Sequence, residues 1–296
     1  MHKTLSLLFL LLALPHTLAA QNRLTEAKAE IEKLILMSGA EKVGVAVYDT
    51  DNKQTLMLNE REVFHAASTM KLPVMMELFR RASDKRLLLT ERLEVKNKFY
   101  SIIDGSEYSL DRRDDSDEEV YRRLGQPMTI LELTEHMITM SSNLATNLLI
   151  EKAQPEKVME LLAKLGINDT KVLRGVEDQK AFNAGKNNVT TAYDLMLMLK
   201  AIHERKVGNG KACEKMIQIL GGQRFNDGIP AGLPRDATVA HKTGSITKHN
   251  HDAALVMPAL RKPYLIVVLT RGIADEKKSD KLIANISRVV YVALAP

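Results

Sequence analysis

A nearly apolar segment, FHAASTMKLPVMMELF, occupies residues 64–79 and leaves few options for where it can lie in a folded protein. A helix that is apolar on most of its sides is normally buried. Pro73 is tolerated only in the first turn or so, so we expect the helix to begin at or near Ser68. Ser68 and Lys71 would then share one face of a buried helix, one turn apart.

The pair has an ordinary structural explanation when it is taken alone. Serine often caps a helix N-terminus, and a lysine can follow it by chance. A second Ser-x-x-Lys copy occurs at Ser245 and Lys248, so the spacing by itself does not identify a site.

The first 20 residues have the features of a secretory signal peptide. Lys3 supplies a positive charge, residues 5–14 are apolar, and small residues follow. We expect cleavage after Ala19 or Ala20 and a secreted or periplasmic mature protein. No later stretch is long and apolar enough for a spanning helix, so we expect no stable membrane insertion.

Composition argues against several classes of function. The chain has 42 basic and 37 acidic residues. The basic residues are scattered and there is no tryptophan, so we expect no nucleic-acid partner. Cys213 is the only cysteine, and we expect it to be a buried structural thiol. We expect His249 and His251 in a loop. Because no metal-ligand spacing is present, we expect neither a metal nor another cofactor.

Hydrophobic periodicity predicts an α+β fold. Strands are expected at residues 43–47, 55–58, 238–243, 251–257 and 264–270. Helices are expected at residues 24–37, 70–81, 129–140, 144–152, 155–165 and 191–203, and in a final segment capped by Ser279. The acidic run at residues 114–119 is expected to be a solvated face.

This order of elements predicts a five-stranded antiparallel sheet flanked by N- and C-terminal helices, with an inserted all-helical domain. We therefore expect a signal peptide (1–20), a sheet domain (21–64 and 225–296) and a helical domain (65–224). An active site between the two domains is the default expectation.

Two further polar clusters stand at the ends of predicted elements. The segment MITMSSNLATNLL places Ser141 and Asn143 between two helices, and VAHKTGS ends a strand. In the order Ser-x-x-Lys, Ser-x-Asn, Lys-Thr-Gly, the three motifs resemble the signature of the penicillin-recognising serine enzymes. The sequence resembles the class A β-lactamases most closely, over nearly all of the chain from about Lys42.

The resemblance implies catalytic roles for four residues. Ser68 would attack an acyl carbon to form an acyl-enzyme, and Lys71 would take its proton. Lys71 needs a lowered pKa for this, and Lys242 is one candidate cause. Ser141 would relay a proton to the leaving nitrogen.

The resemblance also implies a substrate-binding set. Asn143 would hydrogen-bond the substrate's side-chain amide, and Lys242 and Thr243 would hold its carboxylate. The backbone N–H groups of Ser68 and Ser245 would form an oxyanion hole. Gly244 would allow close backbone approach.

The deacylating carboxylate is less clear, because the family's Glu-x-x-Leu-Asn pattern is absent. Glu177 is the first candidate and Asp178 the second, and a solvated loop carboxylate is the alternative for Glu177. Asn183 lies six residues after Glu177 rather than four. Arg174 and the pair at 190–191 are plausible loop anchors, but the acidic partner expected near Val189 is missing.

Two other positions depart from the family. The middle motif carries Ser142 where the family has Asp, and no Arg beyond Lys-Thr-Gly is obvious for the carboxylate. Lys248, His249 and Arg271 are the candidate replacements.

Three functions therefore stay open. The first is a β-lactamase. The second is a DD-peptidase that acts on peptidoglycan peptides, and the third is a non-hydrolysing β-lactam-binding domain. The expected partner is a small-molecule β-lactam or a peptidoglycan peptide, and the expected state is a monomer.

Overall fold

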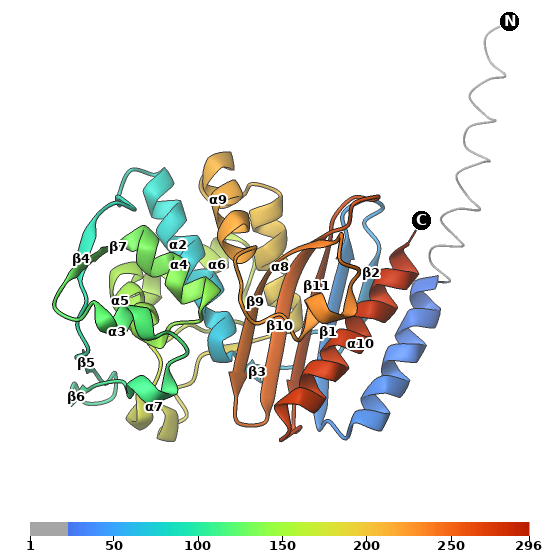
Figure 1. The fold of residues 1–296 in the computed structure, drawn as a ribbon, viewed down its shortest axis with the longest axis horizontal. Helices are drawn as coiled ribbons and strands as arrows, with labels where there is room; N and C mark the ends of the chain where they lie inside the picture. Colours follow the sequence, from blue (N-terminus) through green and yellow to red (C-terminus); the bar gives the residue numbers. More distant parts are fainter. Residues whose placement is uncertain (1–22, 296) are drawn as a thin grey trace, which may run out of the picture.

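A single sheet built from both ends of the chain organises the fold (Figure 1). The computed structural model describes residues 23–295, so the expected signal peptide lies outside the described residues. The strands are all antiparallel and run in the order β2-β1-β11-β10-β9. Their bounds are β1 (Lys42–Asp49), β2 (Thr55–Leu58), β9 (Thr238–Ile246), β10 (His249–Met257) and β11 (Tyr264–Arg271). The predicted α+β class is confirmed.

The central strand β11 is buried on both faces because its alternate side chains enter two cores. Ile266 and Val268 pack with the N-terminal helix (residues 23–38) and with α10 (Glu276–Leu294). Val267 and Leu269 pack with the helical region on the other face. Figure 1 shows the two terminal helices together on one side of the sheet and the helices from α2 to α9 on the other.

The helical region lies between β2 and β9. Its helices are η1 (Ala67–Met70), α2 (Lys71–Ser83), η2 (Arg112–Asp114), α3 (Glu118–Arg122), α4 (Ile130–Thr139), α5 (Asn143–Ala153), α6 (Pro155–Lys164), α7 (Gln179–Asn183), α8 (Ala192–His203) and α9 (Gly210–Leu220). The short helix η3 (Ile229–Gly232) precedes β9 in the chain but packs against α10. Short ribbons pair β3 (Phe64–His65) with β8 (Val189–Thr190), β4 (Arg92–Glu94) with β7 (Pro127–Thr129), and β5 (Phe99–Tyr100) with β6 (Glu107–Tyr108).

Helix α2 lies in the centre of this region and contacts α4, α5, α6, α8 and α9. Its residues from Lys71 to Phe79 are all buried, which confirms the prediction of a buried helix. The one carboxylate in this stretch, Glu77, is fully buried and accepts two hydrogen bonds of 2.8 Å from Arg80. Helix α8 lies between this region and the sheet, in contact with β1, β10 and β11.

Two local predictions were wrong. His249 and His251 belong to strand β10 rather than to a loop, so the strand begins two residues before the predicted start at 251, because β10 pairs with β9 up to the partners His249 and Ile246. The last helix begins at Glu276, and Asp275 caps it by accepting a hydrogen bond from the Lys278 backbone N–H. Ser279 is instead buried inside the first turn.

Cys213 is buried in α9, as expected, and its thiol lies 3.1 Å from the Val207 carbonyl oxygen. Within residues 23–295 no helix combines the length and the apolar character that crossing a membrane requires.

Candidate active site

Ser68 lies in the tight turn η1 that leads into α2, at the junction of the sheet and the helical region. Ala67, just before it, has a φ of 46°, which is unusual for a residue other than glycine. The turn is held by two hydrogen bonds, from the Ala67 N–H to His65 Nδ1 (3.0 Å) and from the Ala66 N–H to the Asn188 carbonyl (2.8 Å). Ser68 itself stays partly exposed, so its hydroxyl can be reached from solvent.

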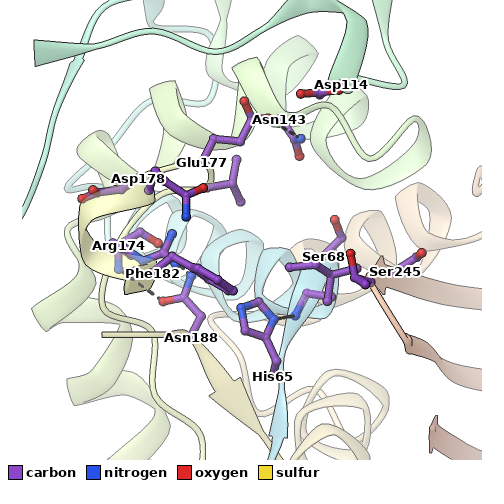
Figure 2. A pocket seen from close by; sticks show the side chains of 15 residues that line it. His65, Ser68, Asp114, Asn143, Arg174, Glu177, Asp178, Phe182, Asn188 and Ser245 are labelled. Carbon is purple, nitrogen blue, oxygen red and sulfur yellow. Dashed lines mark hydrogen bonds between the residues drawn. The ribbon is translucent and has the colours of Figure 1, made fainter. Parts of the chain in front are cut away.

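Two cavities open on either side of Ser68. One, of about 440 Å³, extends toward the segment that carries Glu177, and the other, of about 480 Å³, extends along β9 toward α10. Ser68, Asn143 and Ser245 line both cavities. Figure 2 shows the first cavity, with Ser68 and Ser245 on one side and Glu177 and Asn143 across from them.

The two lysines of the motifs meet at Ser141. Lys71 Nζ donates to the Ser141 carbonyl (2.6 Å), to its Oγ (3.2 Å) and to Asn143 Oδ1 (2.9 Å). Lys242 Nζ lies 3.1 Å from the same Ser141 Oγ. The structure therefore brings the first, second and third motifs into one hydrogen-bonded group. In the described part of the chain the Ser68 hydroxyl has no hydrogen-bond partner and is free to turn toward a substrate.

Both lysines are fully buried, and this changes their acidity. Burial lowers the pKa of Lys71 to about 7, and the carboxylates of Asp115 and Glu177 oppose this effect. Burial, followed by repulsion from Lys71, also lowers the pKa of Lys242. Burial, rather than the charge of Lys242, is thus the main cause of the lowered pKa of Lys71. An amine with a pKa near neutrality can serve as a proton acceptor.

Strand β9 approaches the Ser68 turn closely because it is the edge strand of the sheet, with one edge unpaired by any other strand. A Cβ atom at Gly244 would lie only 2.9 Å from the Thr69 nitrogen and 3.0 Å from the Ser68 nitrogen. A larger residue would push β9 away from the turn. Glycine therefore lets Ser245 come beside the backbone of Ser68.

Glu177 and Asp178 are neighbours in the chain but have different surroundings. Glu177 has a φ of 61°, and its Oε1 accepts a 2.8 Å hydrogen bond from Asn143 Nδ2. Burial raises the pKa of the Glu177 carboxyl, and the Asn143 hydrogen bond partly offsets this. Asp178 is buried and caps α7, and it also accepts hydrogen bonds from the Ser101 hydroxyl and the Ile102 N–H. Glu177 thus faces the motifs, whereas Asp178 anchors the loop.

Arg174 closes the loop that carries Glu177, and no ion pair with an acidic side chain holds it among residues 23–295. Its guanidinium donates to the Lys186 carbonyl (2.8 Å) and to Asn187 Oδ1 (3.0 Å). Asn188 continues the closure by exchanging hydrogen bonds with the backbone at Arg174. The side chains of Thr190 and Thr191 form hydrogen bonds with residues other than Arg174. The Thr190 hydroxyl forms a hydrogen bond with the Thr170 hydroxyl, and Thr191 caps α8.

Two residues of the site were missed in the sequence. Asn147 accepts from the Val176 N–H (2.7 Å) and donates to its carbonyl (3.0 Å), which holds the segment beside Glu177. A Cβ at Gly175 would lie 2.3 Å from Asn147 Oδ1, so this contact requires glycine. Asn147 could have been found, since it lies one helical turn after Asn143 on the same face.

Asp115 is the second missed residue. The expectation of a solvated acidic run was wrong for Asp115 and Asp117, which are both buried. Asp117 binds His136 (2.6 Å), and Asp115 accepts from the N–H groups of Asn143 (2.9 Å) and Leu144 (2.8 Å). No local pattern in the sequence pointed to Asp115.

The candidates for the missing arginine differ in position. Arg271 is paired with Glu41 (3.1 Å) and Glu62 (3.2 Å) and lines neither of the two cavities beside Ser68. Lys248 and His249 line a smaller neighbouring cavity. Lys277, at the start of α10, is the one cation among the residues that line the cavity along β9. Across the described residues, no three acidic, histidine or cysteine side chains are grouped as a metal site requires.

Comparison with known proteins agrees with this geometry. A sequence model described as the beta-lactamase enzyme family matches residues 26–294. A β-lactamase of Bacillus licheniformis is 29% identical over 282 residues, which cover 93% of this chain and 86% of that protein.

Two solved structures are also similar. A mutant of an ancestral class A β-lactamase of Gram-negative bacteria matches with a TM-score of 0.78 and 25% identity, over 90% of this chain and 98% of that one. A mutant of PBP-A, solved as the acyl-enzyme with penicillin G, matches with a TM-score of 0.78 and 25% identity, over 91% and 96%.

Proposed function

The chain belongs to the beta-lactamase enzyme family of serine hydrolases, and we propose that it opens β-lactam rings through an acyl-enzyme on Ser68. One observation carries the proposal. Lys71 and Lys242, both buried, converge on the hydroxyl of Ser141, which lines the same cavity as Ser68. A buried amine of lowered pKa beside a serine that solvent can reach is what nucleophilic catalysis by serine needs.

Acylation follows from this arrangement. Neutral Lys71 takes the proton of the Ser68 hydroxyl as the oxygen attacks the carbonyl carbon of the ring. The carbon–nitrogen bond then breaks. The Ser141 hydroxyl passes its proton to the leaving nitrogen and takes one from protonated Lys71, whose Nζ lies 3.2 Å from the Ser141 Oγ, so Lys71 becomes neutral again. The close approach of Gly244 to the Ser68 turn supports an oxyanion hole made by the N–H groups of Ser68 and Ser245.

Substrate binding uses groups on both sides of Ser68. Thr243 and Lys242 hold the carboxylate, and the Asn143 side chain binds the amide of the acyl substituent. Lys277 lines the cavity on the carboxylate side and carries a positive charge, which supports it as a substitute for the family's arginine.

Deacylation completes the cycle. Glu177 takes a proton from the water that attacks the ester carbonyl, which releases the product acid and restores Ser68. Its place across the cavity from Ser68 and its raised pKa support this role.

We also propose that the enzyme is secreted or periplasmic after signal-peptide cleavage and acts as a monomer. The support for export is the residue pattern of the first 20 positions.

The test is covalent labelling of the purified protein. Incubation with a penicillin, an acid quench and mass spectrometry should place one adduct on Ser68 and none on Ser245, the serine of the second Ser-x-x-Lys copy. An adduct elsewhere, or unmodified Ser68 after a rapid quench, would rule the proposal out. Nitrocefin turnover then separates the candidate functions, since a DD-peptidase or a binding domain would remain acylated for many minutes.

A further inference from the structure

The N-terminus of α5 receives a carboxylate from a distant part of the chain. Asp115 Oδ2 accepts from the N–H groups of Asn143 (2.9 Å) and Leu144 (2.8 Å), and Oδ1 accepts from the Asp117 N–H (3.0 Å). The helix's own cap, Ser142, accepts from the Ala145 N–H (3.2 Å), and its hydroxyl donates a long hydrogen bond of 3.5 Å to the same Asp115 Oδ2. Asp115 is 9% exposed, so these hydrogen bonds form away from bulk water.

The residue that Asp115 holds is itself fixed between opposite charges. Asn143 Oδ1 accepts from Lys71 Nζ (2.9 Å), and Asn143 Nδ2 donates to Glu177 Oε1 (2.8 Å). A cation can only meet the amide oxygen, and a carboxylate can only meet the amide nitrogen, so the amide has one orientation. A shift of the Asn143 backbone would therefore change both contacts at once.

The preceding turn is strained. Ser141 has a φ of 56°, and such a conformation in a residue other than glycine persists only where its surroundings hold it. Lys71 Nζ donates to the Ser141 carbonyl (2.6 Å) on one side of the turn, and Asp115 holds the following N–H groups on the other.

We propose that Asp115 is a positioning residue of this enzyme, which holds residues 141–143 so that Ser141 meets both lysines and Asn143 joins Lys71 to Glu177. The family has an Asp in the middle motif where this chain has Ser142, and Asp115 supplies a carboxylate at the start of α5 in its place. A negative charge at a helix N-terminus is favourable in itself. The inference rests on the proposed function, since it concerns the same catalytic group.

The charge of Asp115 also acts on Lys71. The charged groups that face Lys71 are Lys242 from β9, Glu177 from the loop and Asp115 from the segment before α3. Asp115 raises the pKa of Lys71 against the effect of burial. Loss of this charge lowers the Lys71 pKa further. In a plot of acylation rate against pH, the acid limb, where Lys71 becomes protonated and the rate falls, therefore moves to lower pH. A residue with a purely structural role would leave that limb in place.

The experiment compares Asp115→Asn with Asp117→Asn. Asp117 is equally part of the buried acidic run, but it caps α3 and binds His136 rather than the turn before α5. Single-turnover acylation by nitrocefin is measured against pH, and thermal unfolding is recorded for each variant. Asp115→Asn should be acylated about tenfold or more slowly than the wild type, and the acid limb of its acylation should lie at lower pH. Asp117→Asn should lose comparable thermal stability but keep the wild-type limb.

The inference would be overturned if Asp115→Asn were acylated at the wild-type rate with the acid limb at the wild-type pH. It would also be overturned if both variants lost the same acylation rate and kept the acid limb at the same pH. Should Asp115→Asn not fold, Asp115→Glu replaces it. It keeps the charge but displaces the turn, so acylation should slow while the limb stays in place, and wild-type kinetics there would overturn the inference. Absence of a Ser68 adduct in the wild-type protein is a different result, which would instead refute the proposed function.

Discussion

Replacing Glu177 by glutamine removes a base from the site, and it also removes one of the two carboxylate charges that raise the pKa of Lys71. The glutamine keeps the side-chain length and an oxygen that can accept the 2.8 Å hydrogen bond from Asn143. Loss of a general base slows the step it serves by about 10²–10⁴-fold, or about 2.7–5.5 kcal/mol in activation free energy. Acylation depends on Lys71 and Ser141. Loss of the Glu177 charge lowers the Lys71 pKa further, so acylation should keep its rate above this pKa and extend to lower pH. Glu177→Gln should therefore accumulate acyl-enzyme on Ser68.

The assay is stopped-flow nitrocefin hydrolysis combined with mass spectrometry of the quenched protein. We expect a burst of one product per enzyme molecule, then slow turnover and a persistent adduct. In the wild type only the ionised carboxylate accepts a proton, and burial raises the Glu177 pKa. Deacylation should thus fall as pH decreases through this raised value, and Glu177→Gln should lose that pH dependence.

Asp178→Asn is the matched control, because the neighbouring carboxylate anchors the loop through Ser101, Ile102 and Ala181. It should lower the unfolding temperature and slow both steps. Turnover by Glu177→Gln at the wild-type rate would refute the reasoning, and so would an equal loss in both steps. If the wild type itself keeps a stable adduct, Glu177 is not working as a base and a DD-peptidase becomes the better description.

Three further predictions follow from the structure. Gly244→Ala should reduce acylation measured by nitrocefin burst kinetics, because its Cβ would lie 2.9 Å from the Thr69 nitrogen; a wild-type burst would contradict this. Thr243→Ala should weaken acylation by β-lactams that carry a free carboxylate, by about tenfold or more, and much less by an esterified analogue; equal losses would argue against carboxylate binding. The hydrogen bond from Asp117 raises the pKa of His136, so its stabilisation is complete below about pH 6.5 and is lost as pH rises through the raised value. Thermal unfolding of His136→Gln should show a weaker decline over that window, and an unchanged decline would exclude this pair as its cause.

The sequence alone determined the parts of the protein whose cause is local. The buried helix α2 could be predicted because its apolar residues exclude it from the surface, and the strands of the sheet could be predicted from alternation. The three motifs could be recognised because their residue types and their order resemble the signature of the penicillin-recognising serine enzymes. These features are properties of short segments, so they are visible before any folding is known.

Tertiary structure decided the contacts that join distant segments. Whether Glu177 or Asp178 faces Ser68 depends on which of the two caps α7, and both are acids in the same loop. Asp115 lies 28 residues before Asn143, in a run whose composition is that of a solvated surface. Asp115 is buried because the fold places it at the start of α5. There the first N–H groups of the helix have no partner within the helix and stabilise a carboxylate. Such pairings depend on how the elements pack, and a single sequence carries no local signal for them.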